Sequence, residues 1–441
     1  MKEVKLTEGS IFTKLLVFSV PMIAGNMLQQ VYNLVDTLIV GRFLGANALA
    51  AVGSVYTLMI FLTSVIIGLC MGSGTLFSND FGASDEEMLR KDIHHSFGFI
   101  FLATVLICLV IYPGQGWIQR LLQTPEELWE LTGTYMTVVF GGMIFVFLFN
   151  FFSYLLRAMG NSMVSLVFLT ISALLNIGLD LLLVVVWHYG VGGAAFATVL
   201  SQAVSGIGIT LYSIRHLPLL REKKKAAWDW ARLKFIVVND VMTGIQQSVM
   251  NFGILMIQGL VNSFGTTVMA SFAAAVKIDT VAYMPAQEFG NAYSIYVSQN
   301  FGAKKRKRIH RGTKIAVLTS VVFCGCVSVL IFIFAPELMQ IFIDAGNTAI
   351  ITGGVRYLRI EGACYAGIGL LFLWYGYFRG VNRPQVSLLL TVISLGTRVA
   401  LSYALAPHTA LGVCAIWISI PVGWVLADVC GYILLKTENR K

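Results

Sequence analysis

The stretch SVPMIAGNMLQQVYNLVDTLIVGRFL, residues 19–44, decides how the whole chain is interpreted. It is apolar and long enough to cross a bilayer as a helix, which takes about 20 residues. It nevertheless holds Asp36 with no basic residue nearby to pair with, and a carboxylate at membrane depth by default indicates function. Pro21 should bend this helix, and Tyr32 lies four residues before the acid and so on its face. We interpret the stretch as a moving helix that senses protons or ions in a transporter.

The composition of the whole chain also indicates a membrane protein. Of 441 residues 57% are hydrophobic and 12% are charged, which excludes a soluble protein of this length. In lipid the backbone must hydrogen-bond to itself as helices or a closed barrel, and the apolar runs are too long for barrel strands of about 10 alternating residues. The polar amino end runs straight into the first span, so no cleavable signal peptide is expected. We expect an all-α integral membrane protein with twelve transmembrane helices, at about 15–41, 48–77, 93–113, 131–156, 164–187, 191–214, 235–261, 268–297, 313–334, 352–378, 386–406 and 411–435.

The basic residues predict the orientation of these spans. With twelve spans both termini share one side, and that side holds 25 of the 31 lysines and arginines. The positive-inside rule therefore places both termini in the cytoplasm and the protein in the cell membrane. The run KKRKR at 304–308 fits a topogenic loop that faces anionic headgroups, so no nucleic-acid partner is expected.

The chain contains two copies of one pattern. SNDFGA at 78–83 returns as SQNFGA at 298–303, an offset of 220 residues. Further pairs at 220 or 222 residues are Gly45 with Gly265, Gly192 with Gly412, and Arg157 with Arg379. Because six spans separate equivalent points, the halves are parallel repeats about an axis along the membrane normal. We expect an amino-terminal lobe at 1–214, a cytoplasmic linker loop at 215–234 and a carboxyl-terminal lobe at 235–441, with a cavity between the lobes.

Two acids break this repeat. The correspondences are Asp36 with Met256, Asp180 with Ser402, and Asn176 with Arg398. Only the first half therefore carries this pair of intramembrane carboxylates. Asn176 lies four residues before Asp180 and on the same helical face. The first lobe is acidic where the second carries a base.

A buried pair of carboxylates can take up a proton near physiological pH and release it when water or a cation arrives. It can instead hold Na⁺, a hard cation that prefers oxygen ligands. Tyr32, Asn176 and Thr198 would add such oxygens, and the expected metal ligands are Asp36, Asn176 and Asp180. The residues leave H⁺ and Na⁺ open.

The second half has its own polar side chains within spans. Candidates for binding a cationic substrate are Glu288 and Glu361, which have no base near them in sequence, together with Gln287 and Asn291. Three others, Lys277, Asp279 and Arg398, are left open between a salt-bridge scaffold and substrate contacts.

At these residues the chain resembles the multidrug and toxic compound extrusion (MATE) family over nearly its whole length. The segment VYNLVDTLIVGRFLGANALAAVG, residues 31–53, resembles the DinF-like branch in particular. The resemblance implies that a first-lobe cluster couples transport to a cation. That cluster comprises Tyr32 and Asp36 with the bending Pro21 in helix one, Asn176 and Asp180 in helix five, and Thr198 in helix six. It also implies export of organic cations and other amphipathic toxicants, driven by inward H⁺ or Na⁺, with no other cofactor.

We therefore expect a cation-coupled antiporter that works by alternating access. Its expected partners are small amphipathic or cationic molecules and the lipid bilayer, and the expected state is a monomer. The alternative is a flippase for lipid-linked oligosaccharides of the same superfamily, which would favour a strongly basic cavity, whereas the spans hold only the bases Lys277 and Arg398. An intramembrane enzyme is not expected, because the six histidines all lie in loops or at span ends.

Overall fold

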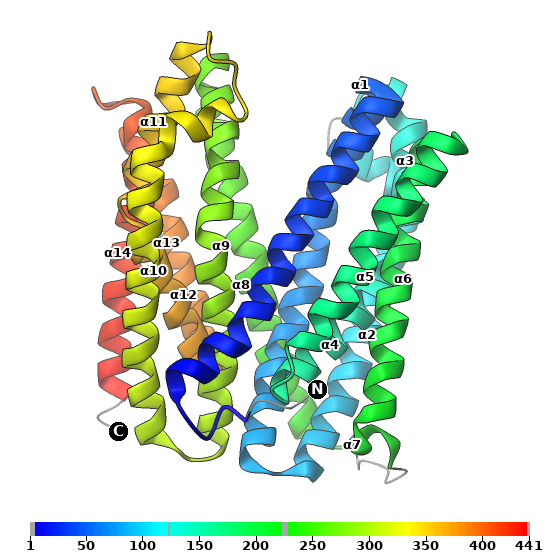
Figure 1. Cartoon of the computed structure of the whole chain (residues 1–441), viewed down its shortest axis with the longest axis vertical. Helices are drawn as coiled ribbons and strands as arrows, with labels where there is room; N and C mark the ends of the chain where they lie inside the picture. The colour runs from blue at the N-terminus through cyan, green and yellow to red at the C-terminus, as the bar shows by residue number, and fades with distance from the viewer. Residues whose placement is uncertain (1–4, 122–123, 223–227, 439–441) are drawn as a thin grey trace. The chain divides into compact units, whose positions relative to one another are not determined.

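The computed structural model describes residues 5–121, 124–222 and 228–438, and these residues are almost entirely helical (Figure 1). Within them, ten helices are long and apolar enough to cross a membrane, and they contain ten of the twelve predicted spans. The predicted span at 235–261 falls in α8 (Trp230–Asn262). The span at 352–378 falls in α11 (Thr348–Gly362) and α12 (Tyr365–Gly380). Helices α11 and α12 are each shorter than the roughly 20 residues that a span requires, so they can cross a membrane only as a pair.

The remaining helices follow the predicted order. They are α1 (Ile11–Ala83), α2 (Glu86–Leu121), η1 (Glu126–Leu128), α3 (Trp129–Gly141), α4 (Met143–Ala158), α5 (Met163–Asp180), η2 (Leu181–Val186), α6 (Gly190–His216), α7 (Pro218–Arg221), α9 (Thr266–Gly302), α10 (Arg306–Gln340), α13 (Pro384–Leu405) and α14 (Val413–Glu438). The first two predicted spans both lie in α1, which is broken at Gly45 with φ 84° and ψ −177°. Glycine has no Cβ and adopts this conformation at little cost, so Gly45 supplies the turn between the two spans.

The described chain forms two compact units that do not follow the order of the sequence. The first unit comprises mainly Val20–Gly244, and the second comprises Leu6–Ser19 together with Ile245–Lys441. Helix α1 therefore begins in the second unit and continues in the first. Helix α8 begins in the first unit and ends in the second. Each unit thus contains the first turns of a helix that belongs mostly to the other.

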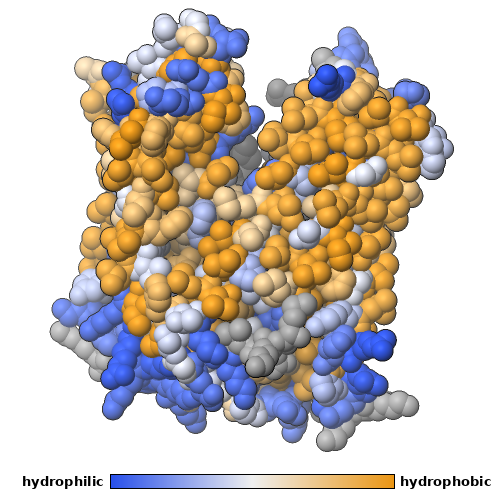
Figure 2. All heavy atoms as spheres, viewed as in Figure 1, coloured by the Kyte–Doolittle hydropathy of each residue, from blue (hydrophilic) through white to orange (hydrophobic). Residues whose placement is uncertain are grey.

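The surface of each unit suits a lipid environment. Figure 2 shows hydrophobic side chains over the sides and hydrophilic side chains gathered at the ends. Large apolar side chains are well exposed, among them Val110 on α2, Leu211 on α6 and Leu330 on α10. Water would make such a surface unfavourable, whereas acyl chains solvate it. The prediction of an all-α membrane protein is confirmed.

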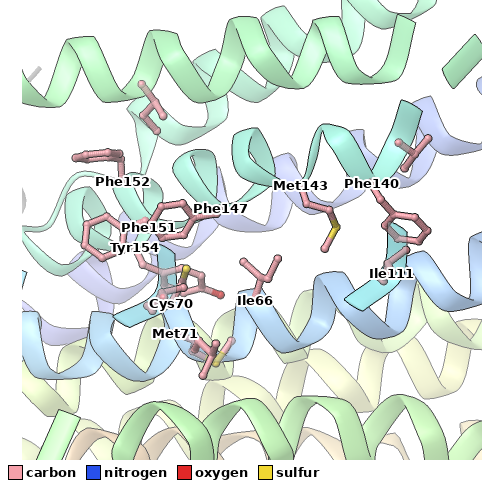
Figure 3. Close-up of a cluster of buried hydrophobic side chains, with 14 of the residues drawn as sticks. Ile66, Cys70, Met71, Ile111, Phe140, Met143, Phe147, Phe151, Phe152 and Tyr154 are labelled. Atoms are coloured by element: carbon pink, nitrogen blue, oxygen red, sulfur yellow. The ribbon is translucent and has the colours of Figure 1, made fainter. Parts of the chain in front are cut away.

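An aromatic core holds the first unit together (Figure 3). Phe147 and Phe151 of α4 point toward Ile66 and Cys70 of α1. The rings of Phe147 and Phe151 lie 5.7 Å apart, and Phe77 of α1 meets Phe151 edge to face at 5.8 Å. Offset and edge-to-face rings add about 0.5–1.5 kcal/mol per pair beyond their burial. The core fixes α4 against the second half of α1.

The backbone itself repeats. Residues with positive φ recur in pairs, namely Gly45 with Gly265 (84° and 95°), Ser84 with Lys304 (57° and 56°), Gly160 with Asn382 (86° and 59°) and Gly190 with Gly412 (60° and 51°). The first two pairs are 220 residues apart and the last two are 222 apart. One pairing in the sequence comparison needs correction, because Gly190 rather than Gly192 shares the left-handed conformation of Gly412.

Candidate functional site

The two acids of the first half meet in the first unit. Asp36 of α1 and Asp180, the last residue of α5, lie within hydrogen-bonding reach of each other. Asp180 is fully buried and Asp36 is half-buried. Among the described residues, no lysine or arginine acts on either carboxyl group. A π-helical turn, η2, follows Asp180 directly, and such turns are frequent at functional sites.

Three tyrosines surround this acid pair. Tyr32 and Tyr56, both of α1, interact electrostatically with Asp36. Tyr135 of α3 interacts with both acids and is buried, with 4% of its surface exposed. Tyr32 was expected from its spacing. Tyr56 and Tyr135 were missed, because they lie in other spans and nothing local in the sequence links them to the acids.

Although the two carboxyl groups lie close together, several polar atoms of this cluster make no donor–acceptor hydrogen bond with any described residue. They are Oδ1 of Asp36, both carboxylate oxygens of Asp180, and Oδ1 and Nδ2 of Asn176. Asn176 is 2% exposed and lies one turn before Asp180. Most buried polar groups in native proteins are hydrogen-bonded, so five such atoms in one place require an explanation. Four of them are oxygens, which suits a proton or a hard cation.

Two predicted members of the cluster, Thr198 and Pro21, have contacts or positions other than those of the acids and tyrosines. The Thr198 hydroxyl donates to the carbonyl of Ala194 in its own helix at 3.1 Å, and among the described residues no hydrogen bond joins it to the acids. Pro21 is buried and α1 stays helical through it. It directly follows Val20, the residue at which α1 enters the first unit.

A second acid pair lies in the second unit. Asp279 of α9 and Glu361 of α11 are within hydrogen-bonding reach of each other, and both are buried. The Tyr365 hydroxyl donates to Asp279 at 2.7 Å and that of Tyr357 at 3.5 Å. Arg398 of α13 acts electrostatically on both acids. Glu361 thus has a base nearby in space that sequence separation concealed.

The other candidate substrate residues form a chain of contacts on α9. Asn291 Nδ2 donates to Glu288 Oε1 at 3.3 Å, and Nη2 of Arg379 donates to Asn291 Oδ1 at 3.0 Å. Arg379 is 3% exposed, so this arginine of the repeat does more than mark orientation. Gln287 is half-buried beside them in sequence. The remaining base, Lys277, lies over the ring of Phe342 at 5.8 Å.

The repeated SNDFGA motif has a role that sequence reasoning missed. In the first unit its Asp80 lies 3.5 Å from Arg232, at the start of α8. Arg232 also binds both carboxylate oxygens of Asp92, with Nε to Oδ1 at 2.6 Å, and Asp92 is fully buried. Beyond it, Asn239 donates to the carbonyl of Gly72 at 2.9 Å. The first turns of α8 are therefore held in the first unit by charge and by close backbone packing.

The SQNFGA copy holds the residues that precede α1 in the second unit. In the second unit Gln299 accepts from the amide of Leu6 at 3.2 Å, and Asn300 donates to its carbonyl at 3.3 Å. Arg308, the last residue of the KKRKR run, donates to the carbonyls of Leu6, Glu8 and Gly9 at 2.9–3.2 Å. The first copy of the motif thus contacts the first turn of α8, and the second contacts the segment just before α1, the other helix that begins in one unit and continues in the other.

Comparison with known proteins identifies the family. The MatE family model matches twice, at residues 21–182 and 243–404, which is an offset of 222 (243 − 21). The probable multidrug resistance protein YpnP of Bacillus subtilis is 30% identical over 399 residues, 89% of this chain and 88% of that protein. The multidrug export protein MepA of Staphylococcus saprophyticus is 26% identical over 400 residues, 88% of this chain and 85% of that protein.

Solved structures agree with the observed fold. A structure described as the outward-facing conformation of a multidrug resistance MATE family transporter of the MOP superfamily superposes with a TM-score of 0.93 at 23% identity, over 99% of this chain and 98% of that chain. A second MATE structure, in complex with MaL6, also gives a TM-score of 0.93 over the same shares of the two chains. With an all-helical membrane fold, a doubled family match and a relative at 30% identity, the chain belongs to the MATE family of membrane transporters.

Proposed function

We propose that this chain exports organic cations and other amphipathic compounds by alternating access, in exchange for inward-moving H⁺ or Na⁺. The observation that carries the proposal is the acid pair Asp36–Asp180, which lies in a membrane-spanning unit and has no basic partner among the described residues. The substrate class is supported by the names of the relatives, since YpnP is called a probable multidrug resistance protein and MepA a multidrug export protein.

The proposed coupling depends on the charge of this pair. Two ionised carboxylates within hydrogen-bonding reach repel each other, and in a low-dielectric site this repulsion is large. A proton or Na⁺ bound between them removes it, and the free carbonyl oxygen of Asn176 supplies a further ligand. The bound ion would be released when the site opens to water.

Helix α1 is the proposed link between ion binding and movement. It carries Asp36 and Tyr32 of the ion site and passes from the second unit to the first beside Pro21. Proline lacks the amide that would close the local hydrogen bond, so a helix bends most readily there. We propose that ion binding biases this bend, that the chain belongs to the DinF-like branch it resembles, and that Thr198 completes the coupling cluster.

The remaining assignments complete the proposal. Along the sequence we divide the transporter into lobes at 1–214 and 235–441, joined by the loop 215–234, whereas the compact units differ from these lobes at residues 6–19 and 235–244. We propose that both termini face the cytoplasm, because the basic residues gather on that side. The transporter acts as a monomer in the cell membrane. The proposed substrate contacts in the second lobe are Gln287, Glu288, Asn291 and Glu361.

Transport by purified protein in proteoliposomes tests the proposal. An imposed pH gradient or Na⁺ gradient should drive uptake of a cationic dye, and Asp36→Asn with Asp180→Asn should abolish the response to the gradient. Asp428→Asn is the matched control, because Asp428 is another acid within a span, on α14, that belongs to neither pair. Full gradient-driven uptake by the Asp36→Asn/Asp180→Asn protein would refute the proposal.

A further inference from the structure

Helix α10 carries three basic side chains on the side that it turns away from the second unit. Lys307, Arg311 and Lys314 follow one another at intervals of four and three residues, so they are neighbours along one side of the helix, and all three are exposed. The side chains that α10 buries, such as Ile309 and Ala316, lie on the opposite side. We call Lys307, Arg311 and Lys314 the basic stripe.

The basic stripe continues directly into a surface that suits lipid. The same side of α10 next presents Leu318 and Val322, with 66% and 57% of their surfaces exposed. Residues 315–336 contain no charged side chain before Glu337 and extend about 33 Å at 1.5 Å per residue, close to the thickness of about 30 Å of the hydrocarbon core. Lys314 therefore lies at the edge of the hydrocarbon, and the other two bases lie about 5 and 10 Å further out, at and just beyond the phospholipid headgroups. Figure 2 shows the same change, from hydrophilic side chains at the lower end of this unit to hydrophobic side chains above them.

The first unit carries the same positions with their charge neutralised. The equivalent residues, 220 earlier in the chain, are Glu87, Lys91 and His94 on α2, and the residues that precede the two helices, Ser84 and Lys304, share a positive φ at the same offset. Glu87 Oε1 binds Lys91 Nζ at 2.8 Å, so these two side chains have no net charge. In the second unit both positions are bases, and no base of the stripe forms an ion pair with another described residue. The repeat has thus produced a neutral pair in one unit and uncompensated bases in the other.

The neighbouring bases of the loop are placed differently. Arg308 donates to carbonyl groups of the amino-terminal segment, and Lys305 Nζ donates to the carbonyl of Thr7 at 3.1 Å. Arg306 is exposed but lies about 100° around the helix from the residue that follows it, and Lys304 precedes the helix. Only the stripe therefore combines uncompensated charge with a continuous path to the lipid-facing side of α10.

We propose that the basic stripe binds the headgroup of one anionic phospholipid, whose acyl chains lie along Leu318 and Val322. The headgroup supplies the negative charge that the three bases complement, and the chains supply apolar surface where the helix becomes apolar. Each base near a membrane surface strengthens the binding of an anionic lipid about fivefold, so Arg311 and Lys314 together contribute about 25-fold and the whole stripe about 100-fold. The proposal does not depend on the coupling ion or on the transported substrate.

Native mass spectrometry of the purified full-length protein in detergent tests the proposal, because it counts bound lipids. Phosphatidylglycerol would be titrated as the anionic lipid and phosphatidylcholine as the lipid without net charge, and excess inorganic phosphate at constant ionic strength would be added as a free anion. The test variant is Arg311→Gln/Lys314→Gln. The matched control is Lys304→Gln/Arg306→Gln, which removes the same charge from exposed positions of the same loop but leaves the stripe intact.

The unchanged protein should bind one phosphatidylglycerol at least about tenfold more tightly than phosphatidylcholine, and Arg311→Gln/Lys314→Gln should weaken this binding about 25-fold. The control variant should change it by less than about threefold, and phosphatidylcholine binding should be equal in all three proteins. Equal weakening in the two variants would overturn the proposal, because the charge of the whole loop would then attract the lipid. Equal affinity of the unchanged protein for the two lipids would also overturn it. So would displacement of the bound lipid by inorganic phosphate, since the site would then recognise a free anion.

Discussion

Replacing Arg232 by glutamine should release the first turns of α8 from the first unit. Arg232 donates to both oxygens of Asp92, which is fully buried, and lies 3.5 Å from Asp80. Removing one partner of a buried ion pair costs about 3–5 kcal/mol, because the remaining charge is left uncompensated. Since 21% of the Arg232 side chain is exposed, we expect a value near the lower end, about 3 kcal/mol. The equilibrium for local opening should then shift on the order of 100-fold.

Hydrogen exchange followed by mass spectrometry measures this opening directly. The amides near the start of α8 should exchange on the order of 100-fold faster in Arg232→Gln than in the unchanged protein. Adding Asp92→Asn should recover part of the protection, because no unpaired carboxylate would then be buried.

Arg90→Gln is the matched control for this experiment. Arg90 pairs with Glu222 at 2.7 Å in the same unit, but the Glu222 side chain is 46% exposed. Exposed ion pairs contribute about 0–1 kcal/mol, so exchange should change by less than about fivefold. Equal exchange in Arg232→Gln and Arg90→Gln would refute the reasoning, since it would mean that burial of Asp92 adds nothing to the anchor.

Three further predictions concern the cap of α8 at Asp229, the contacts of Arg308 and the close packing at Gly376. Asp229 accepts from two backbone amides of the first turn of α8, and these hydrogen bonds hold its pKa below the ordinary value. This cap is therefore fully present above about pH 4 and is lost as the pH falls through the lowered pKa, so Asp229→Ala should speed exchange of that turn at pH 7 by about tenfold, with a smaller effect near pH 2. Arg308→Gln should expose the amino-terminal segment to added protease, whereas Arg306→Gln, two residues earlier and exposed, should not. Gly376→Ala should lower the melting temperature, because its Cβ would lie 2.5 Å from the carbonyl oxygen of Gly290, whereas Gly325→Ala meets nothing within 4 Å and should be neutral or stabilising.

Local composition was enough to predict the fold class and the acids of the first unit. Hydropathy finds spans because each must be apolar over its own length, and Asp36 and Asp180 stand out as charges within such runs. The repeat also predicted the equivalence of Gly45 and Gly265, whose φ values differ by only about 11°. These features can be recognised from neighbouring residues or from a fixed offset between repeats.

What the sequence could not provide is contact between distant spans. Tyr135 joins the first acid pair from α3, and Arg379 reaches Asn291 from 88 residues away. Glu361 was selected because no base lies near it in sequence, yet Arg398 acts on it in the folded unit. Periodicity assigns a residue to a helical face but does not say which other helix that face meets.

The exchange of helix starts between the units has a consequence for biosynthesis. Leu6 leaves the ribosome early, yet its partner Gln299 lies 293 residues later in the chain. At about 5–20 residues per second, roughly 15–60 s pass after Leu6 is made before Gln299, its hydrogen-bond partner, is synthesised. If the gene were divided within the loop 215–234, residues 230–244 would be made as part of the carboxyl-terminal fragment, although they pack in the first unit. We therefore expect neither fragment to mature in the bilayer by itself, and we expect co-expression of the two to restore a complete transporter.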